Sequence, residues 1–250
     1  MGDTIQFSVV DQVAELLLCN QGKHNALGYQ ELDLIDQALA TIDTGIRVLL
    51  IRSPVGATFC SGANLDQILS GDLDGERFQS TTNRIASLPI PTIACISGPV
   101  FGGGFEMAMS CDFRIALSGQ KLRVPASALG LCYPPEGLLR MTRRLGSSLA
   151  RRLLVAAEPM LTDELYRLGV LDFLCVESDF EQTISDYCAR LLQLAPLAVS
   201  AMLDLIREAE TGAFDIDKAR ARARQCLDST DLQEGLLAQR SRRSPVFKGH

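Results

Sequence analysis

The segment covering residues 91–112 constrains the fold of this chain more than any other stretch. It begins with an apolar run, residues 92–96, that predicts a buried strand. Three consecutive glycines, residues 102–104, then lead into an apolar helix start that carries one acid, Glu106. Glycines in a row are costly inside a regular element, so they indicate a backbone that passes close to another group or takes a positive φ. The segment therefore predicts a strand, a tight turn and a helix N-terminus that together form a site.

The glycine turn is suited to binding an oxyanion. The first turn of a helix has N–H groups without intrahelical partners, and its dipole favours negative charge there. Nucleotide binding is the alternative, but residues 102–107 lack the last glycine of G-x-G-x-x-G, and G-x-x-x-x-G-K-[ST] is absent from the chain. We therefore do not expect this turn to hold a phosphate.

Composition restricts the class of protein. The chain has 250 residues, which is enough for one substantial core, and its net charge of −6 gives no general attraction to nucleic acid or to an anionic membrane. The eight cysteines include no C-x-x-C pair and fall mostly in apolar runs, which indicates core residues in a reducing compartment. With neither a signal-peptide pattern nor an apolar stretch of about 18 residues, we expect a cytoplasmic protein.

The histidines exclude several kinds of catalysis. His24 and His250 are the only two in the sequence, so a hydrolase triad would have to depend on His24, and a histidine-rich metal centre is excluded. We expect no metal and no cofactor. The chemistry is left to carboxylates, tyrosines or the backbone.

The order of patterns predicts an α/β fold with a helical end. The expected strands span residues 5–10, 13–18, 47–52, 92–96, 113–116, 121–124 and 169–176. Helical spacing dominates the end of the chain, with helices expected over residues 184–194, 197–210, 214–227 and 232–239. We therefore divide the chain into a core of residues 1–192 and a helical region of residues 193–250.

Two further segments are candidates for the site. Residues 59–65 contain small residues, including Gly62 and Ala63, that let the backbone come near a ligand and supply a second backbone donor. Residues 125–137 form a long irregular stretch before a helix, and loops of this length in compact domains are usually functional.

These segments together resemble the crotonase, or enoyl-CoA hydratase/isomerase, superfamily. The resemblance extends over nearly the whole chain and rests on the segments 23–27, 47–51, 59–65, 90–112 and 231–235. It implies a spiral of ββα units, a C-terminal helical region that builds homotrimers or hexamers, and an acyl-CoA substrate.

The resemblance also implies the site residues. Ala63 and Gly103 match the two backbone N–H groups that hold the thioester oxygen in such enzymes. Asn64 stands where the family pattern often has aspartate. The positions expected to bind substrate are Lys23, Ala26, Leu27, Asn64, Leu65, Gly102, Ala126 and Tyr133.

The carboxylates depart from the hydratase pattern. Glu106 matches the first of the two glutamates that hydratases of the family use, but Ala126 occupies the second position and cannot transfer a proton. Glu136 lies ten residues farther on and is the second catalytic candidate. Because one carboxylate can move a double bond whereas hydration is easier with two groups, the sequence favours enoyl-CoA isomerisation by Glu106.

Three alternatives stay open at this stage. The first is hydration by Glu106 together with Glu136. The second is decarboxylation of a polyketide-type acyl thioester with Tyr133 or Glu136 as proton donor. The third is a non-catalytic trimer that binds acyl-CoA. The thioester is on CoA or on a carrier protein.

Overall fold

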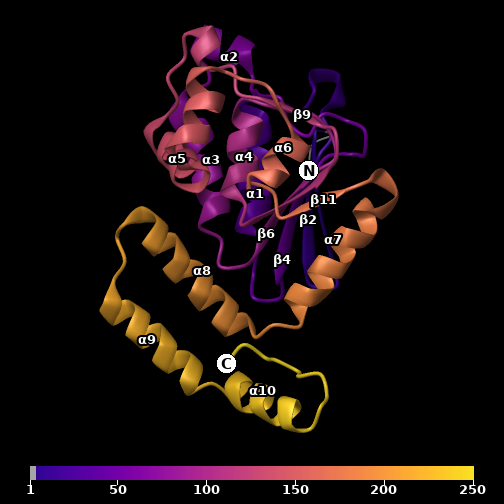
Figure 1. Ribbon diagram of the computed structural model, residues 1–250, viewed down its shortest axis with the longest axis vertical. Helices are drawn as coiled ribbons and strands as arrows, with labels where there is room; N and C mark the ends of the chain where they lie inside the picture. The colour runs from indigo at the N-terminus through magenta and orange to yellow at the C-terminus, as the bar shows by residue number, and fades with distance from the viewer. Residues whose placement is uncertain (1–3) are drawn as a thin grey trace.

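The computed structural model describes residues 4–250 and is built around a six-stranded sheet (Figure 1). Its first two strands are antiparallel, and every later neighbour pair is parallel. The strands, in spatial order, are β1 (Ile5–Val10), β2 (Val13–Leu18), β4 (Val48–Arg52), β6 (Thr92–Ile96), β8 (Phe113–Leu117) and β11 (Phe173–Cys175). The central strands are buried on both faces, which explains their almost continuous apolar sequence.

Two small sheets flank the main one. The first joins β10 (Met160–Leu161), β9 (Lys121–Arg123) and β7 (Val100–Phe101), and the second joins β3 (Ala26–Leu27) and β5 (Gly62–Ala63). The expected strands at residues 113–116 and 121–124 are both present, but they do not pair with each other. After the turn at Gly119, with φ +76°, the chain leaves the main sheet and enters the three-stranded one.

Helices cover both faces of the main sheet. Alternate residues of β4 and β6 point to opposite faces, so Leu49 and Ile51 belong to one apolar cluster and Val48 and Leu50 to another. The second cluster is covered by α7 (Glu177–Leu192). The other helices before α7 are α1 (Tyr29–Ala40), α2 (Leu65–Ser70), α3 (Gly75–Ala86), α4 (Gly103–Ser110), α5 (Pro135–Ala150, with a break at Gly146) and α6 (Thr162–Arg167).

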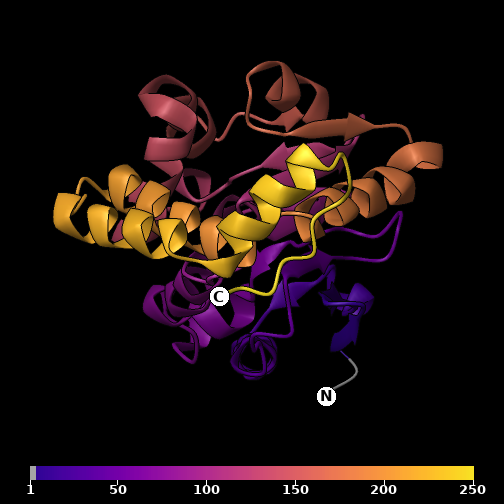
Figure 2. The same cartoon turned by 90° about the horizontal axis from the view of Figure 1, so that it is seen from below.

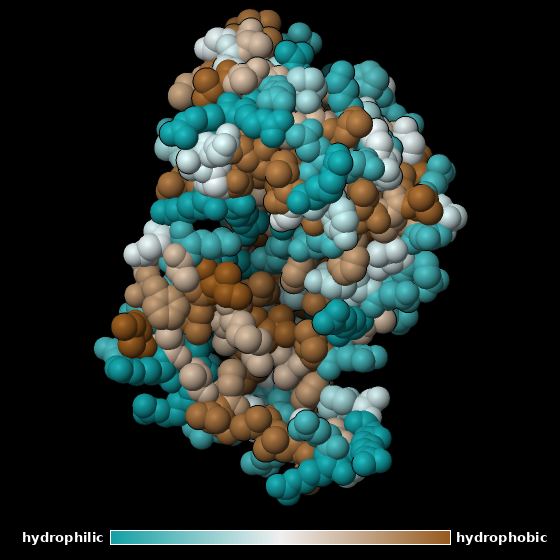
Figure 3. Space-filling model, in the orientation of Figure 1, coloured by the Kyte–Doolittle hydropathy of each residue, from teal (hydrophilic) through white to brown (hydrophobic). Residues whose placement is uncertain are grey.

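The last three helices extend away from this core. They are α8 (Pro196–Thr211), α9 (Ile216–Leu227) and α10 (Thr230–Arg240), and Figure 2 shows them lying across one end of the molecule. Many of their large apolar side chains are exposed, and Figure 3 shows apolar surface gathered in this lower part. None of the single helices within residues 4–250 has the length and apolar character needed to cross a membrane, and the one pair that meets those criteria together, α7 with α8, is bent by 104°.

Parallel pairing brings the two glycine-bearing segments together. Since β4 and β6 are parallel neighbours, the chain leaves both at the same edge of the sheet, where ligands of open α/β sheets bind. The segment after β4 then runs beside the segment after β6, because the Phe59 N–H donates to the Pro99 carbonyl (2.9 Å) and the Phe101 N–H to the Cys60 carbonyl (2.9 Å). The fold thus places β5 against the start of α4.

Candidate active site

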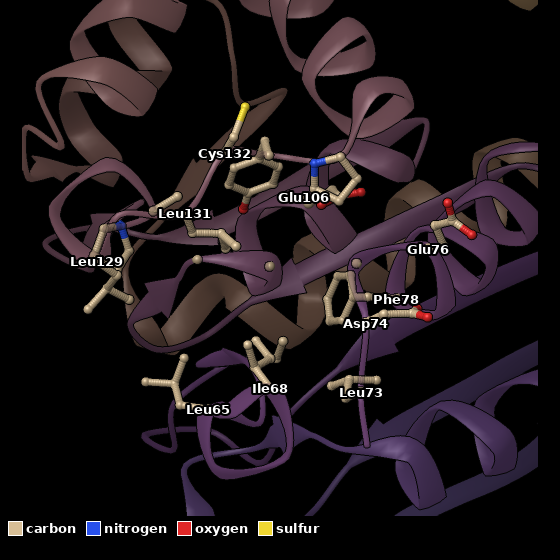
Figure 4. A pocket seen from close by; sticks show the side chains of 18 of the residues that line it. Leu65, Ile68, Leu73, Asp74, Glu76, Phe78, Glu106, Leu129, Leu131 and Cys132 are labelled. Carbon is tan, nitrogen blue, oxygen red and sulfur yellow. The ribbon is translucent and has the colours of Figure 1, made fainter. Parts of the chain in front are cut away.

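A cavity of about 570 Å³ opens beside β5 and the start of α4 (Figure 4). Its walls are mainly apolar. In Figure 4, Leu65, Ile68 and Leu73 lie on one side of the cavity and Leu129 and Leu131 on the other. The polar groups at its inner end come from the backbone of the two glycine turns and from Glu106. Such a shape suits a ligand with an apolar chain and one polar group.

Two residues with candidate donor amides, Ala63 and Gly103, line this cavity from different segments. Gly103 is the first residue of α4, so its N–H has no partner within the helix. The Asn64 N–H donates to the Leu27 carbonyl (2.9 Å), and because successive amides of a strand point in opposite directions, the N–H of Ala63 points away from β3. Ala63 and Gly103 both line the cavity.

Gly62 allows these two segments to touch. Its φ is +93°, and a Cβ at this position would lie only 2.6 Å from the Gly103 nitrogen. A side chain here would force the two turns apart. The close approach explains why the sequence has glycine at this point.

Glu106 lies at the inner end of the cavity and is 1% exposed. Its Oε1 accepts a hydrogen bond from the Thr82 hydroxyl (3.0 Å) and lies 3.9 Å from Nη1 of Arg140. Burial raises the pKa of Glu106, and the hydrogen bond from Thr82 and the charge of Arg140 partly offset that rise. A carboxyl group in this setting can act as a base near neutral pH.

The start of α5 closes over the Glu106 carboxyl group. A Cβ on Gly137 would lie 2.4 Å from Oε1 of Glu106, so a larger residue there would displace the Glu106 carboxyl group. The Gln79 side chain caps this helix, since its Oε1 accepts from the N–H groups of Glu136 (3.1 Å) and Gly137 (3.4 Å).

Glu136, the second acid expected from the sequence, is not brought to the cavity. Its side chain accepts hydrogen bonds from Nδ2 of Asn83 (2.5 Å) and from Nε2 of Gln79, both on α3. It lines a separate cleft of about 410 Å³ between α3, α5 and α8. In this structure its carboxylate therefore does not face a ligand bound beside Glu106.

The other expected substrate-binding residues divide into two groups. Leu65, Gly102, Ala126 and Tyr133 line the cavity, whereas Lys23, Ala26, Leu27 and Asn64 do not. Of the residues outside the lining, Lys23 is exposed on the turn before β3, and Ala26 and Leu27 form β3. The Asn64 side chain caps α2 by accepting a hydrogen bond from the N–H of Asp66 (3.0 Å).

Tyr133 has an unusual place in the lining. Its hydroxyl oxygen is buried and has no hydrogen-bond partner among residues 4–250. Burial, reinforced by the nearby Glu106 and Cys60, raises the pKa of Tyr133 well above its ordinary value, so the phenol stays protonated. A neutral hydroxyl left without a partner is available to a bound ligand.

Sequence reasoning missed Phe78, Thr82 and Arg140. The ring of Phe78 packs so tightly against Gly103 that a Cβ there would lie 2.5 Å from it. Thr82 is buried on α3, which has an otherwise ordinary amphipathic pattern. The sequence signal for Thr82 was a pair of threonines on the apolar side of that helix. This pair does not reveal which acid the helix contacts. Within residues 4–250 there is no cluster of three or more side chains that could hold a metal.

Together, these features define an α/β protein that can polarise a carbonyl group and exchange a proton beside it. The chain belongs to the enoyl-CoA hydratase/isomerase family of the crotonase superfamily, whose acyl-CoA enzymes share this fold, because the family model described as Enoyl-CoA hydratase/isomerase matches residues 9–250. The crotonase-like α/β fold expected from the sequence is confirmed.

Individual relatives extend over the whole chain. A "Probable enoyl-CoA hydratase" of Bacillus subtilis (strain 168) is 30% identical over 251 residues, covering 96% of this chain and 97% of that protein. "Methylmalonyl-CoA decarboxylase" of Escherichia coli (strain K12) is 29% identical over 251 residues, covering 96% of each. The solved structure of an enoyl-CoA hydratase/carnithine racemase from Magnetospirillum magneticum superposes with a TM-score of 0.92 at 24% identity, over 100% of this chain and 97% of that one, which shows the shared fold.

Proposed function

We propose that this protein is an enoyl-CoA isomerase that moves a double bond from the 3 to the 2 position of an acyl-CoA thioester. The observation that carries the proposal is the combination of Ala63 and Gly103 with Glu106, the one buried carboxylate among the described residues of the cavity. Asp74 and Glu76 also line it, but both are exposed, and Asp74 caps α3 by accepting from the Arg77 N–H (2.7 Å).

The geometry supports the following reaction. The thioester oxygen accepts from the N–H groups of Ala63 and Gly103, which stabilise the negative charge of the enolate by about 3 to 4 kcal/mol each. Ionised Glu106 removes a proton from C2 of the 3-enoyl thioester, and the electrons of that C–H bond form the enolate. Protonated Glu106 then returns the proton to C4, so that the double bond lies between C2 and C3 and the acid is ionised again.

Hydration is less well supported because, among residues 4–250, no second buried carboxylate lines the cavity beside Glu106. Ala126, at the position where the second acid would stand, presents a methyl group to the lining. Glu136 is bound by Gln79 and Asn83 of α3 and does not line the cavity. With carboxylates alone, activation of water and delivery of the α-proton would therefore both depend on Glu106.

The activity of the isomerase is expected to fall at acidic pH. Glu106 must be ionised to accept a proton, and its pKa is raised above the ordinary value by burial. The value of kcat/KM should therefore increase with pH until Glu106 is fully ionised, with a midpoint above that of an exposed glutamate. A pH profile of 3-enoyl-CoA turnover measures this midpoint, and a profile that is flat between about pH 5 and pH 8 would contradict the role of Glu106.

Replacing Glu136 with glutamine should lower kcat by less than about tenfold, because its side chain supports α3 and α5 and does not meet the substrate. Turnover of 3-enoyl-CoA and of 2-enoyl-CoA by the purified variant measures the effect. A loss of hydration alone would instead identify Glu136 as the second acid of a hydratase.

A second candidate function is decarboxylation of a 2-carboxyacyl-CoA. The observation that favours it is the buried, unpartnered Tyr133 hydroxyl, which could donate a proton to C2 after the C–C bond to the carboxylate breaks and CO₂ leaves. The similarity to a methylmalonyl-CoA decarboxylase supports the same class of substrate. Incubation with methylmalonyl-CoA distinguishes the candidates, since a decarboxylase yields propionyl-CoA and CO₂ and loses this activity in Tyr133→Phe.

We also propose that the protein is a homotrimer or a pair of trimers. Support comes from the exposed apolar side chains of the C-terminal helical region, which include Met202, Ile206, Phe214, Leu232, Leu236 and Leu237. Exposed apolar patches of this kind mark interaction surfaces. Light scattering should give three or six times the 27.2 kDa mass of the chain, and a monomer at micromolar concentration would contradict the proposal.

A further inference from the structure

Arg140 lies behind the Glu106 carboxylate, on the side away from the cavity. It is placed on α5, one turn after Gly137, and its side chain is 13% exposed. Its Nη1 donates to the Ser110 hydroxyl (2.9 Å) and reaches the Thr82 hydroxyl (3.4 Å), and its Nη2 donates to Oδ1 of Asn83. The guanidinium group is thus fixed by residues of both α3 and α4.

The neighbours of Arg140 also contact Glu106. The Ser110 hydroxyl donates to the Glu106 carbonyl (2.8 Å), so its oxygen is left to accept from Arg140. The Thr82 hydroxyl lies 3.0 Å from Oε1 of Glu106 and 3.0 Å from the Gln79 carbonyl. Because a hydroxyl has one hydrogen, Thr82 can donate to the carboxylate or to that carbonyl, but not to both. The Thr82 hydroxyl therefore need not always donate to the carboxylate. Arg140, in contrast, keeps its positive charge beside the carboxylate whichever way that hydroxyl points.

From this arrangement we infer that Arg140 is a positioning residue for Glu106. Its fixed positive charge stabilises the ionised Glu106 carboxylate from the side opposite the substrate. The inference rests on the proposed role of Glu106 as the base. Arg140 does not line the cavity and acts only through Glu106. An arginine suits this task because its charge cannot be lost at working pH and its planar donors bond to several oxygens at once.

Among residues 4–250, no other cation acts on Glu106 in place of Arg140. The groups that face Glu106 from α3 and from the loop before α5 are the neutral Thr82 and Tyr133, and Arg140 is the cation that affects its pKa. Farther out, Glu136 and Glu210 act on Arg140 as opposite charges and Arg144 acts as a like charge. Without Arg140, burial would raise the pKa of Glu106 with only the Thr82 hydrogen bond against it.

The test compares Arg140→Met with Arg143→Met. Arg143 is on the same helix, but it is exposed and donates to the Thr211 carbonyl (2.9 Å), so its loss should not affect Glu106. We expect Arg140→Met to move the acid limb of kcat/KM upward by about one pH unit, which is a tenfold loss on that limb recovered at higher pH. Arg143→Met should keep the wild-type profile. Equal profiles for the two variants would overturn the inference.

Conservative variants separate charge from packing. Arg140→Lys keeps a positive charge and should return the acid limb most of the way to the wild-type position. If Arg140→Lys moved the acid limb as far as Arg140→Met does, the charge of Arg140 would not be the cause of the shift. If Arg140→Met does not fold, Arg140→Gln removes the charge, can still bond to Ser110, and is held to the same expectation.

A second readout does not depend on turnover. Carbon-13 NMR of glutamate-labelled protein follows the titration of the Glu106 carboxyl group, whose signal is identified by its absence in Glu106→Gln. The midpoint should be about one unit higher in Arg140→Met than in the wild type, and an unchanged midpoint would overturn the inference. A shifted midpoint in a protein that turns over no enoyl-CoA would leave the role of Arg140 intact and reject the proposed function.

Discussion

Replacing Glu106 with glutamine will lower kcat for 3-enoyl-CoA isomerisation by about 10²- to 10⁴-fold, the range typical of losing a general base. Glutamine has nearly the same shape and can still accept from the Thr82 hydroxyl, so the cavity should keep its form. It cannot take the C2 proton. The measurement is single-substrate turnover with purified wild type and variant, with KM expected to change little because Glu106 contributes to the reaction rather than to binding.

The matched control for this variant is Glu136→Gln, the same change in a carboxylate thirty residues along the chain and outside the cavity. Both variants should unfold near the wild-type temperature, which thermal denaturation checks. If Glu136→Gln were the more damaging of the two, or if Glu106→Gln kept full activity, the catalytic assignment would be rejected.

Replacing Gly62 with alanine should lower kcat by about 10²- to 10³-fold, as expected when an oxyanion donor is displaced. The new Cβ would lie 2.6 Å from the Gly103 nitrogen and 3.1 Å from the Phe101 carbonyl oxygen, both backbone atoms that cannot turn aside. Its φ of +93° also disfavours any side chain, at a cost of about 1 to 3 kcal/mol in the free energy of unfolding. Turnover and urea denaturation measure the two effects separately.

Gly56→Ala provides the matched control for the backbone strain. Gly56 also has a positive φ, +80°, but a Cβ there would have no neighbour within 4 Å. Alanine at this position should therefore destabilise the fold without lowering kcat. A comparable loss of kcat in both variants would mean that the effect of Gly62→Ala comes from strain and not from the Gly103 amide.

The local elements of the core could be predicted well from the sequence. The bounds expected for β1, β2 and β6 are confirmed residue for residue, because apolar runs bounded by turn residues determine them locally. The partners of β8 and β9 could not be predicted from the sequences of these strands. β8 pairs with β6 and β11, and β9 pairs with β7 and β10, all of which are other segments of the chain. Sheet order is set by tertiary packing and has no signal in a single strand.

The candidate site was predictable only in part, for a similar reason. Ala63, Gly103 and Glu106 belong to glycine-bearing segments that mark close approach, and the structure brings all three to one cavity. Arg140 and Thr82 carry no such mark, since their places depend on how α3 and α5 pack against α4. The direction of Glu136 depends on the same packing, because Gln79 and Asn83 of α3 hold it away from the cavity.

The most direct measurement is the identity of the product formed from matched 3-enoyl-CoA and 2-enoyl-CoA esters by wild type and Glu106→Gln. We predict that wild type converts the 3-enoyl ester into its 2-enoyl isomer without change of mass, and that Glu106→Gln forms almost none. A product heavier by one water, or the same yield from both proteins, would contradict the proposal that Glu106 alone transfers the proton while the amides of Ala63 and Gly103 hold the thioester oxygen.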